Sequence, residues 1–480
     1  MLFQSLEFLI FLPIVFLLYW FVFKKLKIQN LLVLVASYVF YGWWDWRFLI
    51  LIAITSGLSY WSGILVKRYE DSETKRKWIS AANIVFNLLI LCTFKYLNFF
   101  GDSFVRLFNM FGMHLDWTTV KIILPVGISF YTFQALSYTI DVYRKKIEPT
   151  TDVVAFFAYI SFFPQLVAGP IERSTNLLPQ FQKERVFSYD DAVDGLRQML
   201  WGFFKKIVIA DQCAKYVDVV FANYSTQYSS TLLLATFLFS IQIYSDFSGY
   251  SDIAIGTAKL FGIRLMRNFN NPYFSRDIAE FWRRWHISLT TWFRDYVYIP
   301  LGGSRVSKGK IVRNTFVIFL VSGFWHGANW TFIVWGTYHA LLFLPLILFG
   351  RNRKYLTNIA DNQWLPSLRE LLQMLSTFGL VAFGRIFSRS ATIGDALTFM
   401  SKIFDPSVIS HVLEVNGLNL NVLLLCIAFL TVFEWINRNR NFGLDISNWN
   451  VVVRHVVYWV LLFAIVFFVA DNESFIYFQF

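Results

Sequence analysis

Long apolar runs recur along almost the whole chain, and they limit its possible folds more than any other feature. A helix needs about 20 residues to cross a hydrocarbon core roughly 30 Å thick. The apolar runs cover residues 7–23, 30–46, 49–66, 78–100, 122–140, 315–349, 419–436 and 451–470. We therefore expect an all-α polytopic membrane protein with roughly ten to twelve crossing helices, some of them broken or re-entrant.

The composition leaves no space for a soluble domain between these runs. Hydrophobic residues make up 56% of the 480 residues, and charged residues only 15%, against about 25% in soluble domains. We expect one integral membrane domain over 1–480, with its functional core at about 120–345. The first apolar run lacks a basic start and a small-residue cleavage site, so it is interpreted as a retained helix. The three cysteines form no CxxC pair, which argues against a thiolate metal site, and no metal is expected.

The excess positive charge follows a topological pattern. The net charge is +12, and Lys and Arg concentrate in the loops 24–27, 67–77 and 144–146. The intervening loops, around 45–48 and 100–121, are poorer in both residues. This alternation is typical of the positive-inside rule, so the three basic loops are expected in the cytoplasm and the N-terminus outside. The charge is thus assigned to topology and to contact with membrane lipids, and no nucleic-acid partner is expected.

The middle of the chain, about 151–345, differs from the flanking parts. Its apolar runs are interrupted by Pro, Gly and charged residues. Irregular backbone at membrane depth is tolerated only where it is buried in protein or lines a wet cavity. Asp246 and Asp252 in this stretch are candidate intramembrane carboxylates. They are expected to pair with arginines or to belong to a structural polar network.

His286 is the first of two histidines in unusual surroundings. A titratable ring at membrane depth is costly, so it usually faces a polar cavity or takes part in chemistry. If residues 280–293 form one helix, a single stripe contains Trp282, Trp285, His286, Leu289 and Phe293. Two alternatives stay open. The segment could be an interfacial helix with snorkelling arginines, and His286 could be a hydrogen-bonded structural residue.

His326 is the second histidine, and it lies between Trp325 and Gly327 within the apolar run 315–349. Small neighbours, including Gly323, would let a substrate or another backbone approach closely. An imidazole in a dry pocket suits a general base, although a packed structural histidine is the alternative. His339 would lie about 20 Å farther along the same helix and roughly 220° around it, so it is expected to be structural. The remaining histidines are considered incidental: His114, His411 and His455.

A glycine-rich basic loop follows the His286 segment. It contains Gly302, Gly303, Arg305, Lys308 and Lys310. The spacing is not that of a Walker A motif. Arg305, Lys308 and Lys310 could hold the phosphates of an acyl donor, because Lys and Arg bind phosphate strongly. An ordinary cytoplasmic loop is an equally good interpretation.

Six motifs in order resemble the membrane-bound O-acyltransferase family, and closest of all its bacterial alginate and peptidoglycan O-acetyltransferase branch. They are Ile123–Arg144, Phe162–Arg173, Tyr244–Gly256, Asn270–Gly303, Ser322–Gly336 and Phe475–Phe480. The resemblance implies a ring of helices around a central tunnel, with a cytoplasmic entrance for the donor. It also implies that His326 is the catalytic histidine of the WHG motif and His286 the second motif histidine. One departure is IFSRSA at Ile386–Ala391, where Ser388 replaces a usual aromatic residue.

The resemblance further implies an enzyme of the bacterial inner membrane that acetylates an envelope or exported polysaccharide, such as alginate or peptidoglycan. The expected donor is cytoplasmic acetyl-CoA, with no bound cofactor, and the expected partner is a periplasmic esterase-like acetyltransferase. Two alternatives remain at this point. One is a glycan or lipid transporter without covalent chemistry, which the lack of an internal repeat disfavours. The other is a lipid or protein acyltransferase of the same superfamily.

Overall fold

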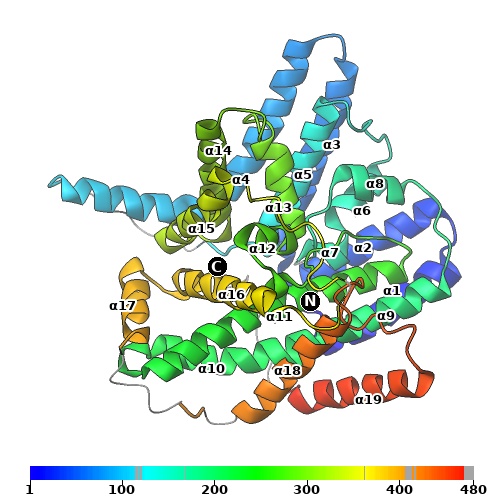
Figure 1. The fold of residues 1–480 in the computed structure, drawn as a ribbon. Helices are drawn as coiled ribbons and strands as arrows, with labels where there is room; N and C mark the ends of the chain where they lie inside the picture. The colour runs from blue at the N-terminus through cyan, green and yellow to red at the C-terminus, as the bar shows by residue number, and fades with distance from the viewer. Residues whose placement is uncertain are drawn as a thin grey trace. The chain divides into compact units, whose positions relative to one another are not determined.

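The computed structural model describes residues 1–113, 117, 120, 122–167, 169–361, 363–405, 413–415 and 418–469. Within these ranges every regular element is a helix, which confirms the all-α prediction (Figure 1). His114, His411 and the motif Phe475–Phe480 lie outside the described residues. The chain divides into two compact units, Met1–Ala192 with Thr257–Met266, and Val193–Gly256 with Arg267–Phe480.

The first unit is built from the N-terminal helices. These are α1 (Leu6–Leu17), η1 (Leu18–Val22), α2 (Leu26–Asp45), η2 (Trp46–Phe48), α3 (Leu49–Arg68), α4 (Glu73–Met110), α5 (Ile128–Tyr143), α6 (Val153–Ser161), α7 (Phe163–Leu166) and α8 (Ser174–Phe181). Some of its buried polar side chains pair with one another. The Asn83 amide of α4 donates to the hydroxyls of Thr139 (2.7 Å) and Ser59 (3.2 Å), so three helices share one buried polar contact.

The second unit contains all the sequence-predicted site residues. Its helices are η3 (Phe204–Ala210), α10 (Asp211–Ala222), η4 (Tyr224–Thr226), η5 (Pro272–Phe274), α12 (Ile278–Arg284), α13 (Ile287–Phe293), η6 (Arg294–Tyr298), α14 (Lys308–His326), α15 (Trp330–Leu348), α16 (Leu368–Arg389), α17 (Ile393–Ile403), α18 (Leu420–Ile436) and α19 (Val451–Phe468). Residues of α9 (Tyr189–Phe203) and α11 (Ser229–Leu260) belong to both units.

Six helical stretches among the described residues are long and apolar enough to cross a membrane. They are Leu26–Arg68, Glu73–Met110, Ser229–Leu260, Trp330–Leu348, Leu368–Arg389 and Val451–Phe468. The last of these has a mean hydropathy of 2.3 and only 6% of it is buried. Phe463 and Phe467 of α19 are more than 70% exposed. Such an apolar exterior is expected where lipid, rather than water, surrounds the helix.

Sequence hydropathy missed two of these stretches, α11 and α16. The apolar window of α11 is 83% buried inside the protein, so its polar residues face other helices and interrupt the apolar pattern. The first turn of α16 contains charged residues and is fixed by a capping box between Ser367 and Glu370. Charge at that end masked the apolar remainder of the helix.

The apolar run 315–349 forms a hairpin of α14 and α15 rather than one helix. The two helices lie side by side, because glycines let their backbones come close (Figure 1). A Cβ atom on Gly323 would lie 2.3 Å from the Phe332 carbonyl oxygen, and one on Gly336 would lie 2.3 Å from the Phe319 carbonyl oxygen. The expectation that Gly323 admits another backbone is therefore confirmed.

Candidate active site

The segment around His286 is broken, and the prediction of one continuous helix over 280–293 is wrong. α12 ends at Arg284 and α13 begins at Ile287, with His286 between them at φ 44° and ψ 55°. The Ile287 N–H donates to the Asn268 carbonyl oxygen at 2.8 Å instead of to a helical partner. A non-glycine residue in this left-handed region costs about 1–3 kcal/mol unless its surroundings impose it.

The imidazole of His286 is enclosed by aromatic rings. Its ring centroid lies 4.6 Å from that of Phe247, 5.8 Å from Trp325 and 6.4 Å from His326. Only 1% of the residue is exposed, and neither ring nitrogen has a hydrogen-bond partner among the described residues. His286 lies outside the six helical stretches that are long and apolar enough to cross a membrane. Burial lowers the pKa of its imidazole to about 3, so the ring is neutral near pH 7.

His326 is the last residue of α14, and the open turn to α15 begins at Gly327. The imidazole contacts the ring of Trp325 at 4.8 Å and that of Trp335 at 5.2 Å, as centroid distances. The residue is 8% exposed. The structure thus brings the two sequence-predicted histidines into one buried cluster of packed rings, the histidine cluster, although 40 positions separate them in the chain.

His339 is closer to the histidine cluster than the sequence suggested. His326 ends α14 and His339 lies on α15, so the prediction that placed both on one helix, about 20 Å apart, is wrong. The His339 ring lies on α15 at 4.9 Å from Trp335 and 5.0 Å from Trp282, so Trp335 touches both histidines. His339 is 1% exposed. Its packing between tryptophans is compatible with the structural role expected for it.

Asp246 and Asp252 pair with lysines that the sequence reading did not single out. Lys206 of η3 lies 3.0 Å from Asp246, and Lys205 forms an ion pair with Asp252. These contacts confirm the expected buried polar network, and Arg267 lines the same cavity as Asp252. The signal in the sequence was the lysine pair inside the otherwise apolar stretch 201–210.

A polar cavity of the second unit begins at this network. Its lining includes Lys205, Tyr244, Asp252, Arg267, Asn268 and Glu434. The Tyr244 hydroxyl donates to the Glu434 carboxylate at 2.7 Å. The ring of Phe269, which also lines the cavity, lies 6.4 Å from that of His286. The cavity therefore comes close to the histidine cluster, with the Phe269 ring between the cavity and His286.

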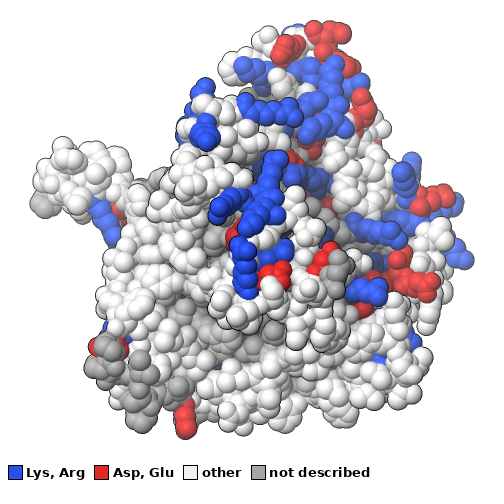
Figure 2. Space-filling view, viewed as in Figure 1, with Lys and Arg blue, Asp and Glu red and all other residues white. Residues whose placement is uncertain are grey.

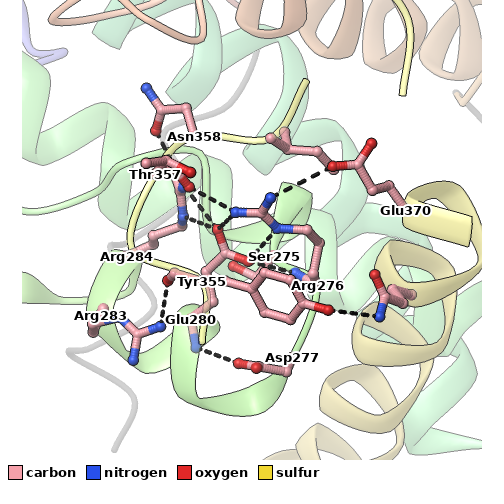
Figure 3. Close-up of polar contacts among 12 residues, drawn as sticks. Ser275, Arg276, Asp277, Glu280, Arg283, Arg284, Tyr355, Thr357, Asn358 and Glu370 are labelled. Carbon is pink, nitrogen blue, oxygen red and sulfur yellow. Dashed lines mark hydrogen bonds and ion pairs between the residues drawn. The ribbon is translucent and has the colours of Figure 1, made fainter. Parts of the chain in front are cut away.

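An ionic cluster fastens α12, which directly precedes His286. The buried carboxylate of Glu280 accepts hydrogen bonds from Arg276 and Arg284, at 2.9–3.1 Å for the side-chain contacts (Figure 3). The Arg276 guanidinium lies 4.4 Å above the ring of Tyr355. Both arginines also donate to the Thr357 carbonyl oxygen, at 2.6 and 3.4 Å. The cluster therefore ties α12 to the segment that follows α15.

The basic loop is not part of the histidine cluster. Arg305, Lys308 and Lys310 are exposed residues at the first turn of α14 and in the loop before it. α14 has 19 residues, so its two ends are about 27 Å apart. Because α15 returns beside α14, the basic residues at 351–354 lie at the same end. Lys and Arg side chains gather at this end of α14 on the surface shown in Figure 2.

The described structure is that of a helical protein with several candidate membrane spans and two neighbouring buried histidines, and comparison with known proteins identifies the family. Residues 148–358 match the model of the membrane-bound O-acyltransferase family. The probable alginate O-acetylase of Pseudomonas putida is 35% identical over 504 residues that cover the whole of both chains. The chain therefore belongs to the membrane-bound O-acyltransferase family. It is a multi-pass membrane enzyme that transfers acyl groups.

Two further relatives act on other polymers according to their names. The peptidoglycan O-acetyltransferase of Helicobacter pylori is 31% identical, with 97% of this chain and 88% of the relative covered. The teichoic acid D-alanyltransferase of Bacillus subtilis is 30% identical, with 54% and 67% covered. Family membership confirms the predicted acyltransferase and favours it over the transporter alternative.

Proposed function

We propose that the protein transfers an acetyl group from cytoplasmic acetyl-CoA, across the bacterial inner membrane, to a hydroxyl of an envelope or exported polysaccharide. Alginate-like polymers and peptidoglycan are the leading acceptors, because the relatives with the greatest coverage carry those names. In this proposal, residues 1–480 act as a single acyltransferase domain. Roughly ten to twelve crossing helices form a ring around a central tunnel. Its functional core comprises residues 120–345.

The observation that supports this proposal most is the pair of buried imidazoles with ring centroids 6.4 Å apart. His326 acts as the general base and takes the proton from the acceptor hydroxyl. The hydroxyl oxygen attacks the thioester carbonyl, the carbon–sulfur bond breaks, and the proton passes from His326 to the departing thiolate of CoA. His286, neutral and without a hydrogen-bond partner among the described residues, is free to donate to the carbonyl oxygen of the reacting acyl group.

The acceptor is reached either directly or through a periplasmic partner. A tunnel lets the small acetyl group cross while CoA stays on the cytoplasmic side. On the second route, an esterase-like periplasmic acetyltransferase takes the acetyl group and completes its transfer to the glycan. In this scheme Arg305, Lys308 and Lys310 hold the phosphates of the donor, because their charges lie at the exposed start of α14.

The first prediction tests the general base. In purified protein supplied with labelled acetyl-CoA and acceptor glycan, His326→Ala should lower the transfer rate by about 10²–10⁴-fold, as removal of a general base does. The matched control is His455→Ala, because His455 is an exposed histidine of α19. Wild-type transfer by a well-folded His326→Ala protein would refute the assignment. Transfer to lipid or protein instead of glycan would favour the other superfamily activities.

A further inference from the structure

The backbone of His286 adopts a conformation that its own residue type disfavours. At φ 44° and ψ 55° it lies in the left-handed region, where a side chain crowds the following carbonyl. Such a residue persists only where the surrounding structure imposes it. The residues before and after His286 would otherwise continue as one helix, since α12 ends one residue before Trp285 and α13 begins directly after His286.

Asn268 makes the contacts that prevent this continuation. Its carbonyl oxygen accepts the N–H of Ile287 at 2.8 Å. Its side-chain oxygen accepts the Ser288 hydroxyl at 2.9 Å and the Ser288 N–H at 3.3 Å. Asn268 thus accepts three hydrogen bonds from Ile287 and Ser288, the two residues that follow His286. Two of these donors are the first N–H groups of α13, which have no partner within that helix.

The other end of the Asn268 side chain is anchored. Its amide donates to the Ser251 hydroxyl of α11 at 3.1 Å, and the whole residue is fully buried. Next to it, the Asn270 N–H donates to the Arg284 carbonyl oxygen at 2.9 Å. The Arg284 guanidinium in turn donates to the Asn270 carbonyl oxygen at 3.2 Å and belongs to the Glu280 cluster. The break between α12 and α13 is therefore held from both sides.

We propose that Asn268 is a positioning residue, which holds His286 in its left-handed conformation and so fixes the imidazole beside His326. This inference rests on the proposed role of His286 in acyl transfer. Asn268 does not touch the reacting atoms in this scheme. It acts through the direction of the His286 side chain, because a shift of about 1 Å at a catalytic group can lower a rate about 10²-fold.

The test compares two variants of similar size and burial. Asn268→Leu keeps the number and branching of the side-chain heavy atoms and removes every side-chain hydrogen bond. We expect kcat to fall about 10–100-fold, with the KM for acetyl-CoA nearly unchanged. The matched control is Asn83→Leu, which removes a buried asparagine that bridges Ser59 and Thr139 in the first unit. The control should lower thermal stability and leave the kcat of the folded protein near its wild-type value.

A double-mutant cycle separates positioning from general structural damage. If Asn268 acts through His286, Asn268→Leu should cause no further loss of kcat in a His286→Ala background. An additive loss would overturn the role of Asn268 and leave the proposed function intact. Wild-type kcat in His286→Ala alone would instead overturn the role of His286, and this inference with it.

Ser288→Ala provides a second route if Asn268→Leu does not fold. It removes the hydroxyl bond to Asn268 and retains the weaker N–H bond. We expect a loss in kcat of roughly 3–10-fold, and this loss should also disappear in the His286→Ala background. A loss that persists there would count against the inference.

Discussion

At the residue scale, hydrogen bonds and burial act in opposite directions on the pKa of one buried carboxyl group, that of Glu172. Glu172, in the loop between α7 and α8, is fully buried. Its carboxylate accepts the Asn176 amide at 2.6 Å and the Met266 N–H. These bonds favour the charged form, but burial dominates and raises the pKa of Glu172 to about 7.

This shift predicts a pH dependence of stability. Because the folded state binds the Glu172 proton more tightly than the unfolded state does, the free energy of unfolding should fall as pH rises from about 4.5 to about 7, by roughly 1–3 kcal/mol. Glu172→Gln should remove this part of the dependence in thermal melts of the detergent-solubilised protein. Asp191→Asn, at a more exposed carboxylate of the same unit, is the control and should keep it. An unchanged profile in Glu172→Gln would contradict the prediction.

The sequence singled out the candidate site residues but did not predict their geometry. His286 and His326 were found because histidine is costly in an apolar setting, and that signal is local. The left-handed turn at His286 was missed, because the Asn268 bonds that impose it come from 18 positions earlier in the chain. The pairing of Lys205 and Lys206 with α11 was missed for the same reason.

At the element scale, α12 is held by charge as well as by packing. Glu280 is buried between Arg276 and Arg284, whose side chains are 7% and 9% exposed. Glu280→Ala would leave two buried guanidinium groups without this carboxylate, and loss of one partner of a buried ion pair costs about 3–5 kcal/mol. We expect a clearly lower melting temperature and reduced acyl transfer, since α12 leads directly to His286.

The control for this prediction lies in the same cluster. Glu370 contacts Arg276 at 3.5 Å, and its side chain is 23% exposed. Since water screens such a pair, Glu370→Ala should cost about 0–1 kcal/mol from the lost ion pair, and loss of its capping-box contacts with Ser367 should add about 1 kcal/mol. Equal destabilisation by Glu280→Ala and Glu370→Ala would show that the buried carboxylate has no special role.

The positions of α2, α3 and α19 were predicted well, because one face of each helix is apolar and exposed. Prediction failed where tertiary contacts override the local pattern. The run 315–349 is mostly apolar, so its periodicity did not reveal the hairpin, although Gly327 and Asn329, the N-cap of α15, mark the turn. In α11 the opposite holds, because buried partners allow polar residues that a hydropathy reading takes for an interruption.

At the scale of the whole molecule, the orientation in the membrane remains a prediction. In the first unit, Lys145 pairs with Glu70 at 2.9 Å and Lys67 with Glu148 at 3.1 Å. Two of the three basic loops, 67–77 and 144–146, therefore lie at the same end of this unit. This arrangement is what the positive-inside rule requires of loops on one side of a membrane.

Single cysteines would test this orientation. In a background without the three native cysteines, cysteine at Lys25, Lys75 or Lys145 should resist an impermeant thiol reagent in intact cells, because these loops are predicted to be cytoplasmic. Arg47 lies in η2, at the opposite end of α3 from Arg68. Cysteine at Arg47 is the positive control and should be labelled from outside. Labelling of all three loop positions, with Arg47 protected, would reverse the orientation.

The length of α14 has a consequence for the choice of donor. The helix separates the basic loop from His326 by about 27 Å, and the close glycine contacts with α15 keep it rigid. If the loop binds phosphate, the donor must span the length of α14 between its phosphates and its reacting carbonyl. Only a donor with a long carrier arm can do so. Neutralising Arg305, Lys308 and Lys310 should then raise the KM for acetyl-CoA. A truncated acetyl thioester without phosphates should be used poorly but equally by both proteins, and an unchanged KM for acetyl-CoA would leave the loop without a part in donor selection.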